Sequence, residues 1–313
     1  MPMHRRSALA AAVVMGVLPL AACGGGSDET PAPTEAPRTS VTDDGSGSPT
    51  IDKIRQNGRL LMGTTDSLPG VSLQDQASGK YSGFDTQLAV AIAKEIGLKD
   101  PDPVRYRSAG VETRLNSLRS GDVDLVVGGI KTNQPQPQIA FVGPYLKVAQ
   151  DLLVRSDSGI TAAAQLDGKP VCVVAGTGAA QKLKAARVTQ NVVEENLGSR
   201  CVEALQAGRV SAFSADDAVL RGYAAQSKGA MKVLGSKLTD EGYYIGIPAR
   251  DKELRRQLEA MLKKSFQDGS WARMYGEVYG TAEPAPTPPV LSPAPVTTTP
   301  SSTTATTTTA PPR

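Results

Sequence analysis

The central part of the chain alternates short apolar runs with amphipathic segments. Residues 60–63 read as a buried strand, and the apolar positions of 84–97 recur every four residues, as on one face of a helix. Further strands are expected at 104–107, 123–127, 151–154, 171–174, near 192 and at 210–214, and further helices over 111–120, 178–187, 199–207, 216–226, 251–266 and around 271–275. Strands that alternate with helices predict an α/β architecture with largely parallel sheets.

A faint internal repeat suggests two related units. In each unit a helix stops at a glycine, Gly121 or Gly208, and leads into a buried strand. Superposing the units places Gly129 opposite Asp216, each just beyond the carboxyl end of a strand. Ligands of open α/β sheets bind beyond these strand ends, so the pattern favours a cleft between two lobes. The same spacing can also arise by chance in α/β proteins.

Both ends of the chain differ from this central part. Basic residues at 4–6 and a small, apolar run over 7–22 end in Leu-Ala-Ala-Cys23, which matches a lipoprotein signal peptide over 1–22 with lipidation at Cys23. The alternative is an ordinary signal peptide followed by a chance cysteine. Residues 23–50 have almost no large apolar side chain, so we expect a disordered tether there. Residues 281–313 are expected to form a Thr/Pro-rich disordered tail.

Composition and charge exclude several classes of protein. The 313 residues contain 34 Lys and Arg against 31 Asp and Glu, and a net charge of +3 does not suggest nucleic-acid binding. The single histidine, His4, lies in the segment expected to be removed. Without it, Ser-His-Asp and Cys-His catalysis and His-ligated metal are excluded. Three cysteines are too few for a Cys-rich zinc site, so no metal and no cofactor is expected.

Two cysteines remain in the central part, Cys172 and Cys201. An exported protein occupies an oxidising compartment, so we expect them to form a disulfide. Closing a loop of about 30 residues stabilises a fold by roughly 3–4 kcal/mol in the chain-entropy model. The alternative is a pair of buried free thiols.

A glycine-rich turn between a strand and a helix is a candidate anion site. Residues 173–180 read Val-Val-Ala-Gly-Thr-Gly-Ala-Ala, and the third glycine of a dinucleotide fingerprint is absent, with Gln181 in its place. Free backbone N–H groups, the positive helix end and the Thr177 hydroxyl suit a carboxylate. A tight turn that binds nothing is the alternative.

Charged residues next to predicted strand ends form a second group of candidates. Asp216 and Asp217 follow a buried strand and open a helix, so one can cap the helix while the other pairs with an ammonium group. Lys131 comes just after the strand at 123–127, and Asp66 follows the first strand. Arg114 lies on the helix 111–120, where an arginine is usually solvated.

Taken together, these segments resemble the family 3 extracellular solute-binding proteins of polar amino-acid ABC transporters. The chain is most similar to the glutamate-binding lipoproteins of Gram-positive bacteria, over nearly all of 51–280. The resemblance rests on the order and spacing of Asn-Gly-Arg-Leu-Leu-Met-Gly at 57–63, Gly-Lys-Tyr-Ser-Gly-Phe-Asp at 79–85, Ser-Gly-Asp-Val-Asp-Leu at 120–125, Phe-Val-Gly-Pro-Tyr at 141–145, Gly176-Thr177, Cys-Val-Glu-Ala-Leu at 201–205, Asp216-Asp217 and Tyr-Tyr-Ile-Gly-Ile at 243–247.

The resemblance implies a two-lobed periplasmic-binding-protein fold of type II, called a Venus flytrap. Two crossover strands near 147–155 and 240–247 would form the hinge. Lobe 1 would comprise 51–148 plus 243–280, and lobe 2 would comprise 149–242. The family closes its lobes on a ligand by a hinge motion.

The resemblance also assigns roles to residues. It implies that Asp216 holds the ligand's α-ammonium, Thr177 its α-carboxylate and Arg114 a side-chain carboxylate. Backbone carbonyls of Gly128 and Gly129 would also accept from the ammonium. The candidate ligand-binding residues are therefore Asp66, Arg114, Gly128, Gly129, Lys131, Thr177 and Asp216.

One departure from the family pattern concerns the α-carboxylate. The family usually places an arginine about six residues before the Phe-x-x-Pro-Tyr segment, but residues 133–138 contain none. Three explanations remain open: Lys131 or another cation substitutes, the ligand is not an ordinary α-amino acid, or affinity has been lost.

The expected function follows from this resemblance. We expect an exported monomer, held at the outer face of the cytoplasmic membrane by its lipid anchor alone, that captures glutamate and delivers it to an ABC permease. A sensor that reports amino-acid availability to a membrane partner is the alternative. An enzyme on the same fold is a remote alternative, since no base and nucleophile pair is evident.

Overall fold

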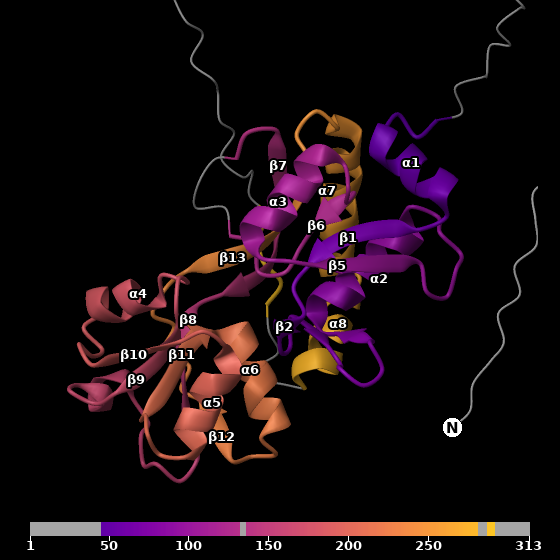
Figure 1. Ribbon diagram of the computed structural model, residues 1–313. Coiled ribbons are helices and arrows are strands. Elements are labelled where there is room, and N and C mark those ends of the chain that lie inside the picture. Colours follow the sequence, from indigo (N-terminus) through magenta and orange to yellow (C-terminus); the bar gives the residue numbers. More distant parts are fainter. Residues whose placement is uncertain (1–44, 132–135, 281–286, 292–313) are drawn as a thin grey trace, which may run out of the picture. The chain divides into compact units, whose positions relative to one another are not determined.

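Two five-stranded sheets form the framework of the molecule (Figure 1). The computed structural model describes residues 45–131, 136–280 and 287–291. In sheet 1, with the order β5-β1-β6-β13-β7, β1 pairs in parallel with β5 and β6, and β13 pairs antiparallel with β6 and β7. Its strands are β1 (Leu60–Thr64), β5 (Val104–Ser108), β6 (Leu125–Val126), β7 (Ile139–Val148) and β13 (Glu241–Pro248).

Sheet 2 repeats this mixed pattern in the order β10-β9-β11-β8-β12. Strand β9 pairs in parallel with β10 and β11, whereas β8 pairs antiparallel with β11 and β12. Its strands are β8 (Gln150–Arg155), β9 (Val171–Val174), β10 (Val192–Glu195), β11 (Ala212–Asp216) and β12 (Met231–Val233).

Each sheet is covered by its own helices, and we call these two units lobe 1 and lobe 2. Lobe 1 contains sheet 1, the small sheet of β2 (Ser67–Leu68), β3 (Ser72–Gln74) and β4 (Tyr81–Ser82), and the helices α1 (Pro49–Asn57), α2 (Phe84–Glu95), α3 (Val111–Ser120), α7 (Lys252–Gln267) and α8 (Ser270–Tyr279). Lobe 2 contains sheet 2 with η1 (Ala163–Leu166), α4 (Ala179–Ala185), α5 (Gly198–Gln206) and α6 (Asp217–Gln226). In Figure 1 the gold helices α7 and α8 return to the indigo and magenta elements of lobe 1.

Half of the strand pairs in each large sheet are antiparallel, so the prediction of largely parallel sheets is wrong. The reason lies in the strands that carry the chain between the lobes. Strands β7 and β8 are consecutive, separated only by Ala149, and β7 belongs to sheet 1 while β8 belongs to sheet 2. Two parallel neighbouring strands need a long crossover connection, usually a helix. The chain passes from β7 to β8 without one, and β8 pairs antiparallel with its neighbours in sheet 2.

The two connections between the lobes lie next to each other. The backbone N–H of Gln150 donates to Thr239 Oγ1 at 2.8 Å, and the N–H of Leu238 donates to the Gln150 carbonyl at 2.8 Å. Glu241, the first residue of β13, is in register with Val148 at the end of β7. The crossovers predicted near 147–155 and 240–247 therefore lie side by side.

Helix α1 was not anticipated, because its first residues fall in the segment expected to be a tether. The Ser48 hydroxyl accepts from the N–H of Ile51 at 3.1 Å, and Pro49 occupies the first helical turn. Ser48 is fully buried. A buried N-cap serine followed by proline is a standard helix start, so the folded part begins before residue 51.

Glycines end the helices where the sequence predicts that they do. Gly121 caps α3 with φ of 81°, and its N–H donates to the Leu118 carbonyl. Gly208 follows α5 with φ of 68°, and its N–H donates to the Leu205 carbonyl. Both backbones adopt the left-handed conformation that glycine allows at little cost.

A disulfide joins Cys172 in β9 to Cys201 in α5, as predicted. Both cysteines are fully buried and belong to the main hydrophobic cluster. That cluster also contains buried residues of lobe 1, such as Phe84 and Trp271, and of lobe 2, such as Phe213. The bridge therefore braces the lobe 2 side of a core that continues into lobe 1.

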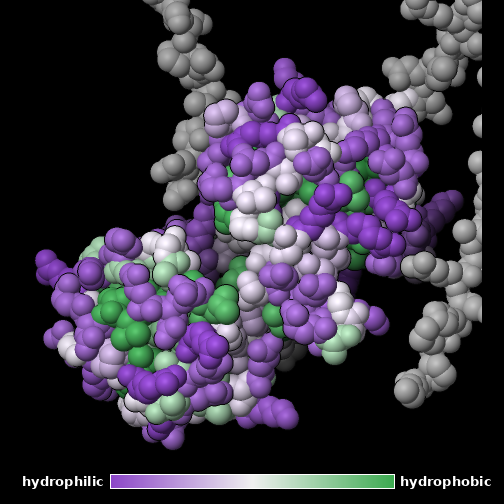
Figure 2. Space-filling view, viewed as in Figure 1, coloured by the Kyte–Doolittle hydropathy of each residue, from purple (hydrophilic) through white to green (hydrophobic). Residues whose placement is uncertain are grey.

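Hydrophilic side chains cover most of the face shown in Figure 2, and the hydrophobic residues visible there gather mainly over lobe 2. Within the described ranges, no helix is long and apolar enough to cross a membrane. A short part of the expected tail, residues 287–291, is described: Pro289 is buried, and Leu291 packs against the main cluster. The other tail residues, the expected signal peptide and the expected lipidation site Cys23 lie outside the described residues.

Candidate functional site

Four charged side chains meet where the two lobes join. Lys131 Nζ lies 2.6 Å from Asp216 Oδ1 and 3.1 Å from Glu241 Oε2. Lys182 Nζ lies 2.7 Å from Glu241 Oε1 and 2.8 Å from Oε2. We call these four residues the ion network. Lys131 of lobe 1 contacts Asp216 of lobe 2 directly, and Glu241 on the crossover links Lys131 to Lys182 of lobe 2.

Different elements bring these side chains together. Asp216 ends β11 and immediately precedes α6, whereas Lys131 follows β6 by five residues. Glu241 begins β13, and Lys182 lies on α4. The side chains are 19–30% exposed, so the network is partly shielded from water.

Hydroxyl groups complete the coordination of both carboxylates. The Tyr243 hydroxyl donates to Asp216 Oδ2 at 2.5 Å, and the Thr239 hydroxyl donates to Glu241 Oε2 at 3.0 Å. Each oxygen of Asp216 therefore already accepts a hydrogen bond. Burial raises the pKa of Tyr243 well above its ordinary value, and the Asp216 charge raises it further, so Tyr243 stays a donor.

Mutual attraction keeps Lys131 and Glu241 charged. Burial acts to lower the pKa of Lys131, but the carboxylates of Asp216 and Glu241 outweigh this effect and raise it overall. Burial acts to raise the pKa of Glu241, but hydrogen bonds from Lys182 and Lys131 lower it overall. Lys131 and Glu241 are therefore ionised at neutral pH.

A second cluster lies behind the glycine loop of lobe 1. Arg114 is only 3% exposed, and its Nη1 donates to the carbonyls of Val127 at 2.7 Å and Gly128 at 3.0 Å. The Gly128 N–H in turn donates to Asp85 Oδ2 at 2.6 Å, and the Tyr145 hydroxyl donates to Oδ1 at 2.8 Å. This cluster fixes the loop that the resemblance assigns to the ligand's ammonium.

Asp85 is the carboxyl group of this cluster, and its pKa is strongly shifted. Its complete burial raises its pKa to about 7, although hydrogen bonds from Tyr145 and Gly128 and the nearby Arg114 charge act to lower it. Arg114 Nε is buried with no hydrogen-bond partner among the described residues. A Cβ at Gly128 would lie 2.1 Å from Arg114 Nη1, so glycine is required where the loop crosses the guanidinium.

The structure brings together some of the predicted site residues and separates others. Lys131 and Asp216 are in direct contact. Gly129 lies beside them, because a Cβ built on it would be 3.6 Å from the hydroxyl of Tyr243, which binds Asp216. Asp66 instead lies near Tyr81. Burial is the larger cause of the raised pKa of Tyr81, and the negative charge of Asp66 raises it further.

Thr177 lies in an exposed turn at the start of α4. Its hydroxyl donates to the Val174 carbonyl at 2.7 Å and accepts from the Ala179 N–H at 3.4 Å. Gly176 and Gly178 both have positive φ, and a Cβ on either would meet no atom within 4 Å. The backbone of this turn is therefore open on its outer side.

The two neighbouring aspartates have different tasks. Asp216 occupies the N-cap position of α6, but its side chain makes no capping bond and turns to Lys131. Asp217 Oδ1 accepts from the N–H of Ala149 at 3.1 Å, which ties α6 to the first crossover. The expectation that one of the pair caps the helix through its side chain is thus not met by Asp216.

Sequence reasoning missed Glu241, Lys182, Tyr243 and Asp85. Tyr243 and Asp85 are part of segments used for the resemblance, but nothing in those segments indicates their contacts. Glu241 and Lys182 look like ordinary exposed charges, and no local pattern links residues so far apart in the chain. Within the described ranges, no group of three or more His, Cys, Asp or Glu side chains could hold a metal ion.

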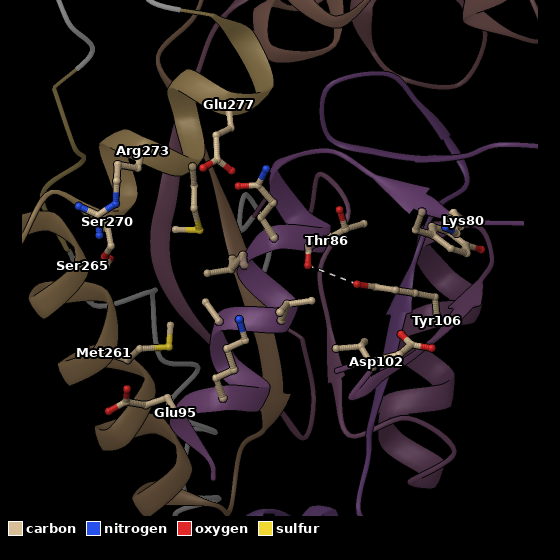
Figure 3. A pocket seen from close by; sticks show the side chains of 18 of the residues that line it. Lys80, Thr86, Glu95, Asp102, Tyr106, Met261, Ser265, Ser270, Arg273 and Glu277 are labelled. Atoms are coloured by element: carbon tan, nitrogen blue, oxygen red, sulfur yellow. Dashed lines mark hydrogen bonds between the residues drawn. The ribbon is translucent and has the colours of Figure 1, made fainter. Parts of the chain in front are cut away.

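A separate hollow of about 1250 Å³ lies on lobe 1 (Figure 3). It is lined by α2, β4, β5, α7 and α8, and the labelled Tyr106 hydroxyl donates to the Thr86 carbonyl at 3.2 Å within it. None of the predicted ligand-binding residues lines it. The hollow and the ion network are therefore separate features.

Comparison with known proteins places this geometry among transport proteins. The model for bacterial extracellular solute-binding proteins, family 3, matches residues 60–281. The ABC transporter glutamine-binding protein GlnH of Bacillus subtilis is 29% identical over 276 residues, covering 87% of this chain and 96% of that protein. The glutamate-binding protein GluB of Corynebacterium efficiens is 31% identical over 288 residues, covering 88% and 91%.

A solved structure gives the same result for the fold. The ancestral cationic amino acid solute-binding protein AncCDT-1 matches with a TM-score of 0.63 and 28% identity, covering 74% of this chain and 99% of that one. This match agrees with the predicted two-lobed α/β fold.

Proposed function

The chain belongs to the bacterial extracellular solute-binding proteins of family 3, and we propose that it captures a polar α-amino acid between its lobes and delivers it to the permease of an ABC transporter. The observation that carries this proposal is the Lys131–Asp216 contact. It joins the last residue of β11 in sheet 2 to a residue that follows β6 of sheet 1, beside the crossovers. Ligands of open α/β sheets bind at such strand ends.

Glutamate is the first candidate ligand, and glutamine is the second. One relative is named a glutamate-binding protein and another a glutamine-binding protein, and both align with most of this chain. A Cβ on Gly176 or Gly178 would meet no atom within 4 Å, so the backbone of the Thr177 turn is open, which supports a carboxylate contact. The carboxylate of Asp216 carries the charge opposite to that of an ammonium group, so it supports a contact with the ligand's α-ammonium.

The proposal includes the division into lobes and the lipid anchor. Sheets 1 and 2 would be the cores of lobes divided near 148 and 243, and Cys23 would carry the lipid that holds the protein at the outer face of the membrane. The relatives are named as binding proteins, so we propose capture without turnover. Ligand recovered chemically intact after long incubation with the protein is the expected result.

Isothermal titration calorimetry tests the proposal. The full chain with Cys23→Ser, which removes the acylation site, would be refolded to strip carried ligand and titrated with glutamate, glutamine, aspartate, asparagine, arginine and histidine. We expect a dissociation constant of about 1 μM or tighter for glutamate or glutamine. Failure of all six to bind would overturn the proposal.

A further inference from the structure

The carboxylate that would hold a ligand's ammonium already holds an ammonium of the protein. Asp216 Oδ1 accepts from Lys131 Nζ at 2.6 Å, and its Oδ2 accepts from the Tyr243 hydroxyl. A ligand ammonium must therefore displace one of these donors. Lys131 is the donor with the same chemical group and the same charge as the ligand.

We propose that Lys131 is an exchangeable substitute for the ligand's α-ammonium. In the ligand-free protein it pairs with Asp216; when an α-amino acid enters, the ligand's ammonium takes Asp216 and Lys131 Nζ pairs with the ligand's α-carboxylate. This inference rests on the proposed function, because it needs a ligand with both groups on one carbon. Lys131 thereby becomes the residue that recognises the α-carboxylate.

The contacts of Lys131 allow this exchange. Its ammonium has three donors, and Glu241 accepts from it at 3.1 Å in addition to Asp216. Glu241 is itself held by Lys182 and by the Thr239 hydroxyl, so it stays in place when Asp216 is released. A flexible four-carbon stem can move Nζ away from Asp216 while keeping the bond to Glu241.

Charge balance supports a zwitterion in particular. The ion network contains two cations and two carboxylates, so it is neutral as it stands. A zwitterion placed between Lys131 and Asp216 gives each charge a new partner and leaves the sum unchanged. A ligand with only an ammonium would leave Lys131 without Asp216, and a partly buried charge without a partner is costly.

The sequence supports the same assignment. Residues 132–138 contain no arginine, although the resemblance implies one in this segment for the α-carboxylate. Lys131 immediately precedes the segment, and its Nζ already reaches the opposite lobe. A lysine binds a carboxylate as a point charge rather than as a bidentate fork, so it can serve two partners in turn.

A cycle between protein and ligand variants tests the exchange. Affinities of the Cys23→Ser protein and of its Lys131→Met variant would be measured for glutamate, glutamine and their α-amides, which lack the α-carboxylate charge. We expect amidation to weaken binding about 100-fold in the protein with Lys131 and only a few-fold in Lys131→Met. Lys131→Gln is the second variant, and Lys147→Met, which removes an exposed ion pair with Asp240, is the matched control.

The outcomes separate the exchange from the proposed function. If amidation weakens binding by the same factor with and without Lys131, the exchange is wrong while the amino-acid receptor stands. If Lys131→Met tightens binding of acid and amide alike, Lys131 only competes for Asp216, which also overturns the exchange. If the protein with Lys131 binds neither glutamate nor glutamine nor their amides, the exchange is wrong for these ligands, and the proposed function itself fails when the other four amino acids of the calorimetric panel do not bind either.

A measurement without ligand tests the first half of the exchange. Hydrogen exchange by mass spectrometry should show faster exchange around 214–217 and 239–243 in the ligand-free Lys131→Met variant than in the ligand-free Cys23→Ser protein. Identical exchange in the two proteins would overturn the role of Lys131 as the partner of Asp216.

Discussion

A single methyl group on α6 should weaken the contact between the lobes. Gly222 lies on α6 of lobe 2, and a Cβ built there would be 2.3 Å from the carbonyl carbon and oxygen of Pro69 and 2.6 Å from the nitrogen of Gly70. Those atoms are backbone of the turn between β2 and β3 in lobe 1. Backbone cannot rotate away as a side chain can, so in Gly222→Ala the turn and the helix must move apart.

Two opposing effects set the size of the change. Alanine is better than glycine in a helix interior by about 1 kcal/mol, which favours the folded state as a whole. Overpacking costs about 1–3 kcal/mol, but only in the arrangement where the turn touches α6. In the described arrangement the net effect lies between no change and a loss of about 2 kcal/mol, so we expect Gly222→Ala to unfold at a similar or lower denaturant concentration. We expect the ligand-bound protein to keep this close approach of the lobes, so Gly222→Ala should bind its amino acid about 5–150-fold more weakly.

Gly276→Ala is the matched control for this experiment. Gly276 lies inside α8, and a Cβ there would meet no atom within 4 Å. It should gain about 1 kcal/mol of stability with unchanged affinity. Calorimetric titration and urea unfolding of both variants measure the two effects. Wild-type affinity in Gly222→Ala would refute the argument that ligand binding uses this close approach.

Three further predictions concern the buried groups. Because burial raises the pKa of Asp85 to about 7, the unfolded chain releases this proton at lower pH than the folded one. The free energy of unfolding should therefore fall as the pH rises from about 4 to 7, and urea titrations should find this slope reduced in Asp85→Asn. Arg114→Met strands the carbonyl of Gly128 and removes the cation beside Asp85, so urea unfolding should show a loss of about 3–5 kcal/mol; wild-type stability would mean that Arg114 is not a structural residue. Replacing Cys172 and Cys201 by alanine should cost about 3–4 kcal/mol, and the denatured, unreduced Cys23→Ser protein should contain no thiol that reacts with a thiol reagent.

Most of the helices and about half of the strands follow from the sequence, because their signals are local. Apolar spacing and the glycine stops at 121 and 208 are read within a dozen residues, and the structure places elements there. Helix α1 had a local signal too, since Ser48 and Pro49 form a helix start. A polar, Pro-containing stretch is also typical of a tether, and the pattern alone favoured that interpretation.

The site could be predicted only in part, because its contacts join distant segments. Lys131 and Asp216 each stood out beside a strand end, but their pairing depends on how the two sheets meet. The expectation that an arginine on this helix is solvated is wrong for Arg114, which is buried against the glycine loop; its contact with a ligand stays a prediction. Glu241 could not be distinguished from a surface glutamate, because its partners lie 59 and 110 residues away along the chain.

The start of α1 is fastened to the rest of lobe 1, and this has a mechanical consequence. Asp251 Oδ2 accepts from the Ser48 hydroxyl at 2.7 Å and from the Thr50 N–H at 3.1 Å, while its Oδ1 caps α7 through the N–H of Leu254. A force applied to the chain before residue 45 first reaches Ser46 and Ser48, which are tied to Asp52 in α1 and to this carboxylate. The load then passes into α7, the longest helix of the described chain, so a pull from the N-terminal side is borne by lobe 1 and not by the ion network.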